Sequence, residues 1–396
     1  MASADDARSG ESEPPLRRLV DDFLESKAER GSGAYAASAA SVLDRFAEWL
    51  AARDRTLADL DDERRGPQLM RGYAKHLRRR ANAADGISAA TANTYYAYVS
   101  GCLAYGVRDM TLSVNPARSE TAREELPAAE GKRSDQQFWS RDQRDALVEH
   151  AARRASTAIE AEPFAALTEA RDHALVATLA FAGVRGAEVL CHRKDDRRGR
   201  QGLRWSRVDL DDGTVEVLGK SKTEGKRWQH ASLPGPARDA LATLKRVQRP
   251  PTPDWPVFVT DHAPTLWSCA REELGDERVD DLVAEHGDVG AVLRAEAVVP
   301  PALTTDGGRS VLRRLTDAAG IDLPDGASYL KPHGARRGIG EELYRVDRGL
   351  AQDLLRHEEL STTKDHYQHI DAAERTAAID AELERLDDER GDDEPR

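Results

Sequence analysis

The segment PHGARR, residues 332–337, combines an imidazole and a guanidinium at an expected helix start. Pro332 is typical of the first helical position. His333 and Arg336 are three positions apart and would share one face of that helix. A helix amino end with these two groups on one side is a good seat for a phosphate. The alternative is an exposed histidine beside surface arginines.

A second group of cations lies in the segment GKSKTEGKR, residues 219–227. Three of the chain's ten lysines, Lys220, Lys222 and Lys226, fall there and are followed by Arg227, although the chain otherwise prefers arginine. A lysine can donate a proton, which an arginine effectively cannot do. The tip of a hairpin could also project these side chains into a DNA groove. The ordinary alternative is a solvated loop.

Three further positions complete an ordered series. Arg185 follows an apolar segment, with Glu188 three residues later, and alone it would be interpreted as a helix-end cation. His357 and Tyr367 come near the carboxyl end, where a single tyrosine is most often a half-buried packing residue. The distinctive feature is the order Arg, Lys, His-x-x-Arg, His, Tyr within one domain.

This ordered set resembles the tyrosine recombinase (phage integrase) family, and in particular its Xer-like site-specific recombinases. AFAGVRGAEVL resembles the first family box, HGAR the second, and LLRHEELSTTKDHY the third. FAEWL and TANTYYAYVS, in the amino-terminal half, look like parts of the family's helical core-binding domain. The resemblance extends over residues 16–371.

Three features depart from the usual family pattern. Arg337 stands where many members have histidine, and Arg356 stands where they have the glycine before the third-box histidine. The interval from His357 to Tyr367 is ten residues, one more than in the commonest members.

The resemblance implies that DNA strands are cleaved by the phenol of Tyr367, which leaves a 3′-phosphotyrosine and a free 5′-hydroxyl. A 5′-hydroxyl from a partner strand then reverses the step. Arg185 and Arg336 would bind the non-bridging oxygens of the phosphorane, where negative charge gathers. Because the ester conserves the bond energy, neither ATP nor a redox cofactor is expected. A metal is not expected either, because the sequence shows no convincing metal site. His366 and His369 flank Tyr367 but have no third metal ligand at useful spacing.

The resemblance also assigns supporting roles. The acid that protonates the leaving oxygen would be the hairpin lysine, with Lys222 preferred and Lys220 second. His333 and His357 would hydrogen-bond the phosphate or assist proton transfer. Glu188 would orient its neighbours.

Helices must position these groups, and their apolar spacing is visible in the amino-terminal half. Residues 1–15 are polar and predicted to be disordered, and residues 16–117 are predicted to form a helical domain. Gly66-Pro67 is interpreted as a breaker, Ser88 as an N-cap and Asn115-Pro116-Ala117 as a helix stop. Four apolar stripes support this prediction: Leu16 to Leu24, Val42 to Leu50, Leu69 to Leu77, and Tyr95, Val99 and Leu103.

Residues 118–137 are predicted to be an exposed linker, and residues 138–371 the catalytic domain. Ser140 should cap its first helix, and residues 172–190 should form a second, central one. Three short strands are expected within residues 202–233. Residues 268–303 look like an insertion, and residues 372–396 like a terminal helix with an acidic tail. The predicted fold is mainly α with a small antiparallel β-sheet, as a helical core-binding (SAM-like) domain joined to an α+β catalytic domain.

Composition limits the environment of the chain. It has 396 residues, a net charge of −13, and 48 arginines among its 58 basic residues. Few lysines and many carboxylates suggest adaptation to concentrated salt, as in a halophilic archaeon, although a GC-rich genome would favour the same residues. The absence of apolar runs near ~18 residues argues against a membrane span. Cys102, Cys191 and Cys269 are widely separated, which argues against disulfides and a cysteine zinc site. We expect a cytoplasmic, nucleoid-associated protein.

The expected partner is double-stranded DNA, because local basic patches can bind it despite a negative total charge. The patches proposed for this role are Arg78-Arg79-Arg80, Arg153-Arg154, Arg197-Arg198 with Arg200, Lys220 to Arg227, and Arg337. Self-association as a tetramer on two duplexes is expected from the resemblance, with the terminal helix packed on a neighbour. Two other functions remain open: a catalytically impaired DNA-binding relative, and a type IB topoisomerase-like relaxing enzyme.

Overall fold

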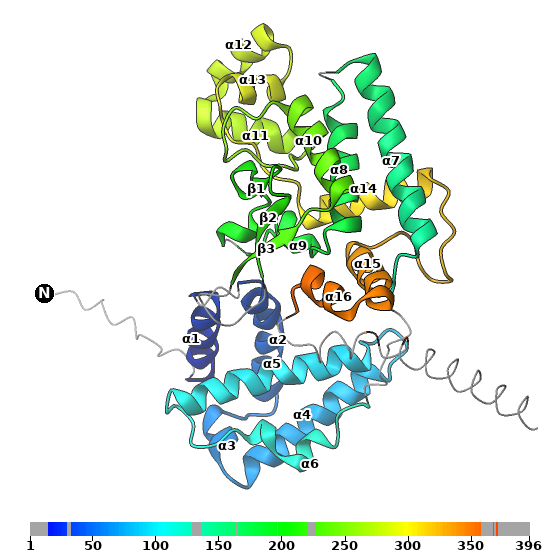
Figure 1. Cartoon of the computed structure of the whole chain (residues 1–396). Helices are drawn as coiled ribbons and strands as arrows, with labels where there is room; N and C mark the ends of the chain where they lie inside the picture. Colours follow the sequence, from blue (N-terminus) through cyan, green and yellow to red (C-terminus); the bar gives the residue numbers. More distant parts are fainter. Residues whose placement is uncertain are drawn as a thin grey trace, which may run out of the picture. The chain divides into compact units, whose positions relative to one another are not determined.

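The computed structural model describes residues 15–29, 33–128, 136–163, 165–195, 197–219, 227–357, 367 and 370 (Figure 1). The chain divides into two compact units. One comprises Met1–Asp135 and Lys194–Asp196, and the other comprises Gln136–Arg193 and Arg197–Arg396. The tail predicted for residues 1–15, apart from Pro15, and the terminal helix predicted for residues 372–396 lie outside the described residues.

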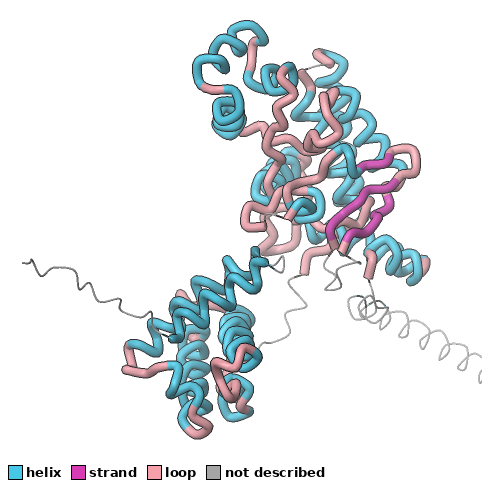
Figure 2. The backbone as a smooth tube through the Cα atoms, turned by 90° about the vertical axis from the view of Figure 1, so that its left-hand side faces the viewer, coloured by secondary structure: helices cyan, strands magenta, loops and turns pink. Residues whose placement is uncertain are grey.

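The first unit is helical in every described element (Figure 2). The apolar stripes lie on helices whose buried faces form one core, as their spacing predicted. Phe23, Phe46, Met70 and Leu103 are each almost fully buried in it. The elements are α1 (Pro15–Glu29), α2 (Gly33–Ala51), α3 (Leu57–Asp61), α4 (Arg65–Ala81), α5 (Ala89–Arg108), the 3₁₀ turn η1 (Pro116–Arg118) and α6 (Glu120–Arg123).

Three boundaries in this unit differ from the predictions. Gly66-Pro67 lies in the first turn of α4 and does not precede it, because proline is tolerated where no intrahelical N–H bond is needed. Helix α5 ends at Arg108, before the predicted stop at Asn115. The segment predicted as an exposed linker begins with ordered structure, since Ala122 of α6 is buried.

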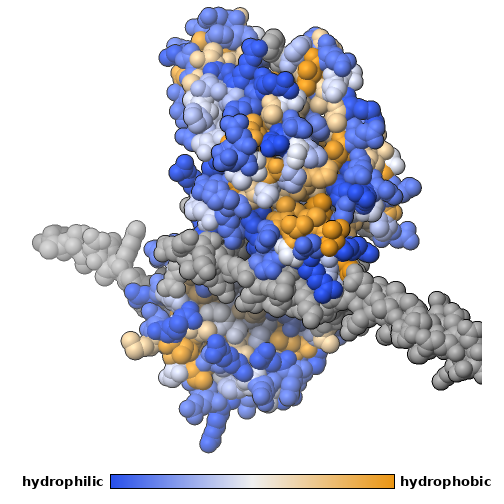
Figure 3. Space-filling model, in the orientation of Figure 1, coloured by the Kyte–Doolittle hydropathy of each residue, from blue (hydrophilic) through white to orange (hydrophobic). Residues whose placement is uncertain are grey.

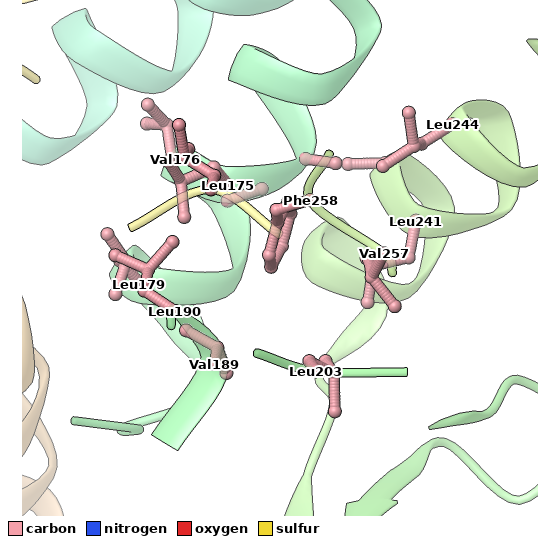
Figure 4. Packing of buried hydrophobic residues seen from close by; sticks show 14 of the residues in the cluster. Leu175, Val176, Leu179, Val189, Leu190, Leu203, Leu241, Leu244, Val257 and Phe258 are labelled. Carbon is pink, nitrogen blue, oxygen red and sulfur yellow. The ribbon is translucent and has the colours of Figure 1, made fainter. Parts of the chain in front are cut away.

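The second unit is built around helix α8 (Leu167–Phe181), which is buried along most of its length. It packs against α7 (Arg141–Ala161), α10 (Gly235–Gln248) and α15 (Pro332–Val346). Figure 4 shows Phe258 between Leu175 of α8 and Leu241 of α10. The apolar sequence of α8 therefore forms the central helix of this core.

The two N-caps predicted from the sequence are confirmed. The Ser88 hydroxyl accepts from the Thr91 amide at 3.1 Å, directly before α5. The Ser140 hydroxyl accepts from the Gln143 amide at 3.2 Å, directly before α7. Each bond satisfies an amide that has no partner within its helix.

The predicted helix over residues 172–190 is in fact two helices. Helix α8 ends at Phe181, and α9 (Gly186–Val189) follows after a break. Gly183 has φ +58°, a left-handed conformation that disfavours a side chain, and a Cβ there would lie 3.0 Å from Leu354. This break frees the Gly183 carbonyl and places Arg185 at the start of a new helix.

The three predicted strands are confirmed. They are β1 (Val208–Asp209), β2 (Thr214–Leu218) and β3 (Trp228–Ser232), antiparallel in the order β1-β2-β3. Val215 pairs with Ala231, so that their side chains share the buried face of the sheet. The tip between β2 and β3, residues 220–226, lies outside the described residues.

The rest of this unit is helical. Residues 268–303, which the sequence analysis describes as an insertion, contribute to three helices, and Ala270, Val279 and Leu293 of these helices are buried in the core. Residues 334–355 are divided between two helices. The remaining elements are η2 (Arg198–Arg200), η3 (Trp205–Arg207), α11 (Ala263–Leu274), α12 (Asp276–His286), α13 (Val289–Ala295), α14 (Thr305–Ala318) and α16 (Arg348–Leu355).

Candidate active site

Arg336 is the most deeply buried of the predicted site cations in the described residues. It lies in the second turn of α15, and its side chain is 3% exposed. Its two terminal nitrogens donate to the carbonyl oxygens of Gly183 and Leu355. Burial, and then the charge of Arg185, lower the pKa of Arg336 to about 9. The guanidinium therefore joins the break after α8 to the end of α16.

Two glycines set the position of helix α15, which begins at Pro332 as predicted. A Cβ at Gly338 would overlap the Trp139 carbonyl oxygen, and one at Gly334 would lie 2.9 Å from the Trp139 ring. The Trp139 indole nitrogen also donates to the Lys331 carbonyl oxygen at 3.0 Å. The first turns of α15 thus lie directly against the segment that precedes α7, which fixes the direction of this helix.

Arg185 and Glu188 form a close pair at the start of α9. The Arg185 side chain donates to Glu188 Oε1 at 2.8 Å, and its backbone N–H donates to Oε2 at 2.7 Å. Glu188 is completely buried, while the Arg185 side chain is 21% exposed. A second guanidinium, that of Arg356, donates to Glu188 Oε2 at 2.7 Å. One buried carboxylate therefore holds two arginines.

These charges decide the protonation of Glu188. Burial alone would raise the pKa of its carboxyl, but Arg356 and then Arg185 outweigh burial and hold the pKa below its ordinary value. Glu188 is therefore ionised at neutral pH and anchors both cations.

Tyr367 is buried against helix α15, with 2% of its surface exposed. Its hydroxyl donates to the Arg337 carbonyl oxygen at 3.3 Å. Its ring packs on Tyr344, with centroids 5.1 Å apart, and on Phe138 at 6.4 Å. A Cβ at Gly340 would overlap the hydroxyl, so the absence of a side chain there makes room for the phenol.

The hydroxyl of Tyr367 is less acidic than an ordinary phenol. Burial raises its pKa to about 12, although Arg336 and Arg337 act in the opposite direction. The structure thus brings the phenol into electrostatic reach of Arg336 and holds it protonated.

The two predicted histidines differ in exposure. His333 is exposed in the first turn of α15, and His357 is half-buried directly after Arg356. The His357 backbone N–H donates to the Gln352 carbonyl oxygen at 3.2 Å, which ties it to α16. Arg337 is half-buried, and its Nε has no hydrogen-bond partner among the described residues.

The hairpin residues are placed only in part. Lys220, Lys222 and Lys226 lie outside the described residues. Arg227 is half-buried beside β3, and its carbonyl oxygen accepts from the Gly219 amide at 2.6 Å. The position of Arg227 therefore marks the base of the loop that carries the predicted lysines.

The basic cluster of the first unit lies on the last turn of α4. Arg78 pairs with Glu125 at 2.8 Å, while Arg79 is exposed and Arg80 is half-exposed. Arg79 and Arg80 therefore reach solvent while the ion pair between Arg78 and Glu125 stays in place.

The basic clusters of the second unit have local partners. Arg153 of α7 donates to Glu149 at 2.5 Å. Arg200 is buried and donates to the carbonyl oxygens of Ala187 and Gly219. Arg200 therefore joins α9 to the end of β2, a structural role that the sequence did not predict.

Two residues of this site were missed by sequence reasoning. Arg356 was noted only as a departure from glycine, yet it binds Glu188. Gly340 was not singled out, and its only signal is a glycine four positions after Arg336 in an expected helix.

The described residues lack two other kinds of feature. None of their helices is long and apolar enough to cross a bilayer. They also contain no group of three or more His, Cys, Asp or Glu side chains arranged to hold a metal ion.

The chain matches no protein-family model and no curated protein, but it is similar to several solved structures. One is the Tn1549 transposon integrase in complex with a circular intermediate DNA, with 13% identity, a TM-score of 0.51, and coverage of 93% of this chain and 99% of that one. The same integrase with transposon right-end DNA gives 13% identity, a TM-score of 0.50 and the same coverage.

The chain has the tyrosine recombinase fold. A third similar structure is the XerH site-specific recombinase bound to a palindromic difH substrate, at 16% identity, a TM-score of 0.49, and coverage of 93% of this chain and 97% of that one. The predicted fold class, mainly helical with a small antiparallel sheet, is confirmed.

Proposed function

We propose that this protein is a site-specific DNA recombinase of the tyrosine recombinase family. One observation carries the proposal: Arg185, Arg336 and Tyr367, far apart in the sequence, belong to one network in the second unit. Arg336 donates to the carbonyl oxygen of Gly183, two residues before Arg185, and the Tyr367 hydroxyl donates to the carbonyl oxygen of the residue after Arg336. The fold supports the same function, since a similar integrase was solved with a circular intermediate DNA.

In the proposed reaction, the Tyr367 phenolate attacks a DNA phosphorus. The bond from phosphorus to the 5′ oxygen breaks, and a 3′-phosphotyrosine and a free 5′-hydroxyl result. Arg185 and Arg336 bind the non-bridging oxygens. A 5′-hydroxyl of a partner strand then attacks the phosphotyrosine and releases the phenol. The energy of the broken ester is conserved in the new one.

Proton transfer completes the mechanism. The preferred acid for the leaving 5′ oxygen is Lys222, with Lys220 second. His333 and His357 hydrogen-bond the phosphate or assist the transfer. None of these roles requires a metal or ATP.

The arrangement of Tyr367 describes a resting state in this proposal. Its hydroxyl is bound to the Arg337 carbonyl oxygen, and burial raises its pKa to about 12. Cleavage therefore requires the phenol to leave this pocket and lose its proton near the bound phosphate. The same observation favours a second candidate, a DNA-binding relative with impaired catalysis.

The proposed partner is double-stranded DNA, on which the protein would act as a tetramer across two duplexes. In the first unit, Arg79 and Arg80 are available as backbone contacts, whereas Arg78 would first have to exchange its partner Glu125. A cytoplasmic, nucleoid-associated location follows from this partner.

The second unit would add backbone contacts around the reacting phosphate. Lys226 and Arg227 would bind next to the hairpin, and Arg337 would bind beside the phenol.

The test traps the covalent intermediate. The full chain is incubated with a nicked suicide duplex that carries a site selected by binding from a randomised pool, and the products are run on a denaturing gel. Tyr367→Phe should abolish the adduct and leave DNA binding intact, because the ring still packs while the nucleophile is lost. Tyr329→Phe removes a hydroxyl elsewhere in the same unit and serves as the control.

The possible outcomes separate the candidates. No adduct with the wild-type chain, combined with specific binding, would favour the impaired relative. An adduct without recombinant product from two marked duplexes would favour a type IB topoisomerase-like enzyme.

A further inference from the structure

Arg356 occupies a backbone position that ordinarily suits glycine. It ends helix α16 with φ 52° and ψ 47°, the left-handed conformation. A residue with a Cβ is less stable there than glycine, by roughly 1 kcal/mol. An arginine at such a position is consistent with a side chain that makes compensating contacts.

The side chain of Arg356 makes such contacts inside the candidate site. It is 7% exposed and donates to Glu188 Oε2 at 2.7 Å. It also donates to the Leu354 carbonyl oxygen at 3.3 Å. Because Glu188 has no exposed surface, its charge must be balanced by the groups that it touches, Arg185 and Arg356.

The backbone around Arg356 is held from two further directions. The Leu355 carbonyl oxygen accepts from Arg336, and the Arg356 N–H donates to the Asp353 carbonyl oxygen at 3.1 Å. The Gln352 carbonyl oxygen accepts from the His357 N–H, and the Gln352 side-chain amide donates to the His357 carbonyl oxygen, each at 3.2 Å. The turn over residues 355–357 is therefore tied to Arg336 and, through the Arg356 side chain, to Glu188, which also holds Arg185.

We infer that Arg356 is a positioning residue for the proposed reaction: by sharing Glu188 with Arg185, it fixes both the Arg185 guanidinium and the turn that carries His357. This inference rests on the proposed function. The Arg356 guanidinium donates to Glu188, so in this inference it acts through that carboxylate and not by binding the DNA phosphate. Its contribution should therefore depend on that carboxylate.

The test compares the rate of adduct formation in single turnover on the suicide duplex. Arg356→Gly removes the side chain and also relieves the backbone strain. It should slow cleavage by about tenfold or more, because one partner of a buried carboxylate is lost. DNA binding should be unchanged. Arg356→Lys keeps a cation and should recover part of the rate.

Arg249→Gly is a matched control. Arg249 also ends a helix in the left-handed conformation, with φ 47°, but it is exposed at the end of α10. This variant changes the same residue type in the same backbone conformation and should cleave at the wild-type rate.

Two further measurements distinguish positioning from a merely structural role. As the pH falls, the Arg356→Gly variant should lose cleavage activity at a higher pH than the wild type. The reason is that Glu188 takes up a proton more easily when Arg356 is absent. In the double variant with Glu188→Gln, the Arg356→Gly change should cause no further loss. If Arg356→Gly unfolds the protein, Arg356→Lys combined with Glu188→Gln gives the same comparison.

Wild-type cleavage together with an unaffected Arg356→Gly variant would overturn this inference alone. Additive losses in the double variant would also overturn it, because Arg356 would then act independently of Glu188. A wild-type chain that binds its selected duplex but never forms an adduct would instead overturn the proposed function.

Discussion

At the scale of single residues, the charge and the position of the groups in the candidate site depend on the neighbours with which they are buried. Glu188 is ionised although it is fully buried, because two guanidiniums bind it. Tyr367 fits beside α15 only because residue 340 is glycine. The contacts of Glu188 with Arg356 and of Tyr367 with Gly340 join residues that are distant in the sequence.

The Glu188 pair should make stability depend on pH. The pKa of Glu188 is lower in the folded chain than its ordinary value of 4.5, so its contribution is present above that value and is lost as the pH falls through the lower folded pKa. Glu188→Gln should cost about 3–5 kcal/mol at neutral pH, because the buried Arg356 and the partly exposed Arg185 both lose their partner. In urea unfolding, the difference in free energy of unfolding between the wild type and Glu188→Gln should narrow only below pH 4.5. A constant difference throughout the acid range would contradict the prediction.

Gly340→Ala should displace the phenol of Tyr367. The new Cβ would overlap the hydroxyl, far inside contact distance. We expect a loss of about 1–3 kcal/mol in the free energy of unfolding, as in other overpacked sites. Thermal or urea unfolding measures it. Gly235→Ala, where a Cβ would meet nothing within 4 Å, is the control and should not lose stability.

At the scale of elements, local signals set where helices begin, and long-range packing sets where some of them end. The Ser88 and Ser140 caps lie where their sequence context predicted them. The break between α8 and α9 was missed, because Gly183 is followed by further helix-compatible residues and its conformation depends on packing against Leu354.

Ser140→Ala should destabilise the first turn of α7. Its hydroxyl accepts from the Gln143 amide, and losing an N-cap costs about 1 kcal/mol. Hydrogen exchange should accelerate in the first turn of α7 and not in α5. Ser88→Ala provides the reciprocal control, with the effect confined to α5. Equal acceleration in both helices for either variant would contradict this local origin.

At the scale of the whole molecule, the unequal distribution of charge is the main feature. Hydrophilic side chains cover much of the face in Figure 3, as expected for a chain with 33% charged residues. Residues 371–396 hold eleven acidic residues against four arginines, more than half of the net charge of −13. Under the proposed function, contacts with DNA would therefore have to come from local basic groups.

Binding to the selected duplex should be retained when salt approaches molar concentration, if the acidic composition reflects adaptation to salt. The Debye length is then only ~3 Å, so counterion release contributes little and direct hydrogen bonds must carry the affinity. Filter binding or anisotropy across a salt series measures the slope. A steep loss between low and molar salt would favour the explanation from a GC-rich genome.

The sequence by itself determined the helical stripes, the caps, the three strands and the order of the residues that could take part in catalysis. These signals are local, because apolar spacing and turn chemistry act within a few residues. The candidate site residues, from Arg185 to Tyr367, could be recognised as one set only because their order along the chain resembles that of a known family.

Only the tertiary structure decided how those residues meet. The Gly183 carbonyl, the Leu355 carbonyl and Arg336 come from three separate segments, and no spacing rule relates them. In the sequence, Arg356 is only a departure from the family's glycine, whereas in the packed structure its side chain donates to Glu188. Burial and electrostatic partnership are properties of the packed core, in which residues distant along the chain become neighbours.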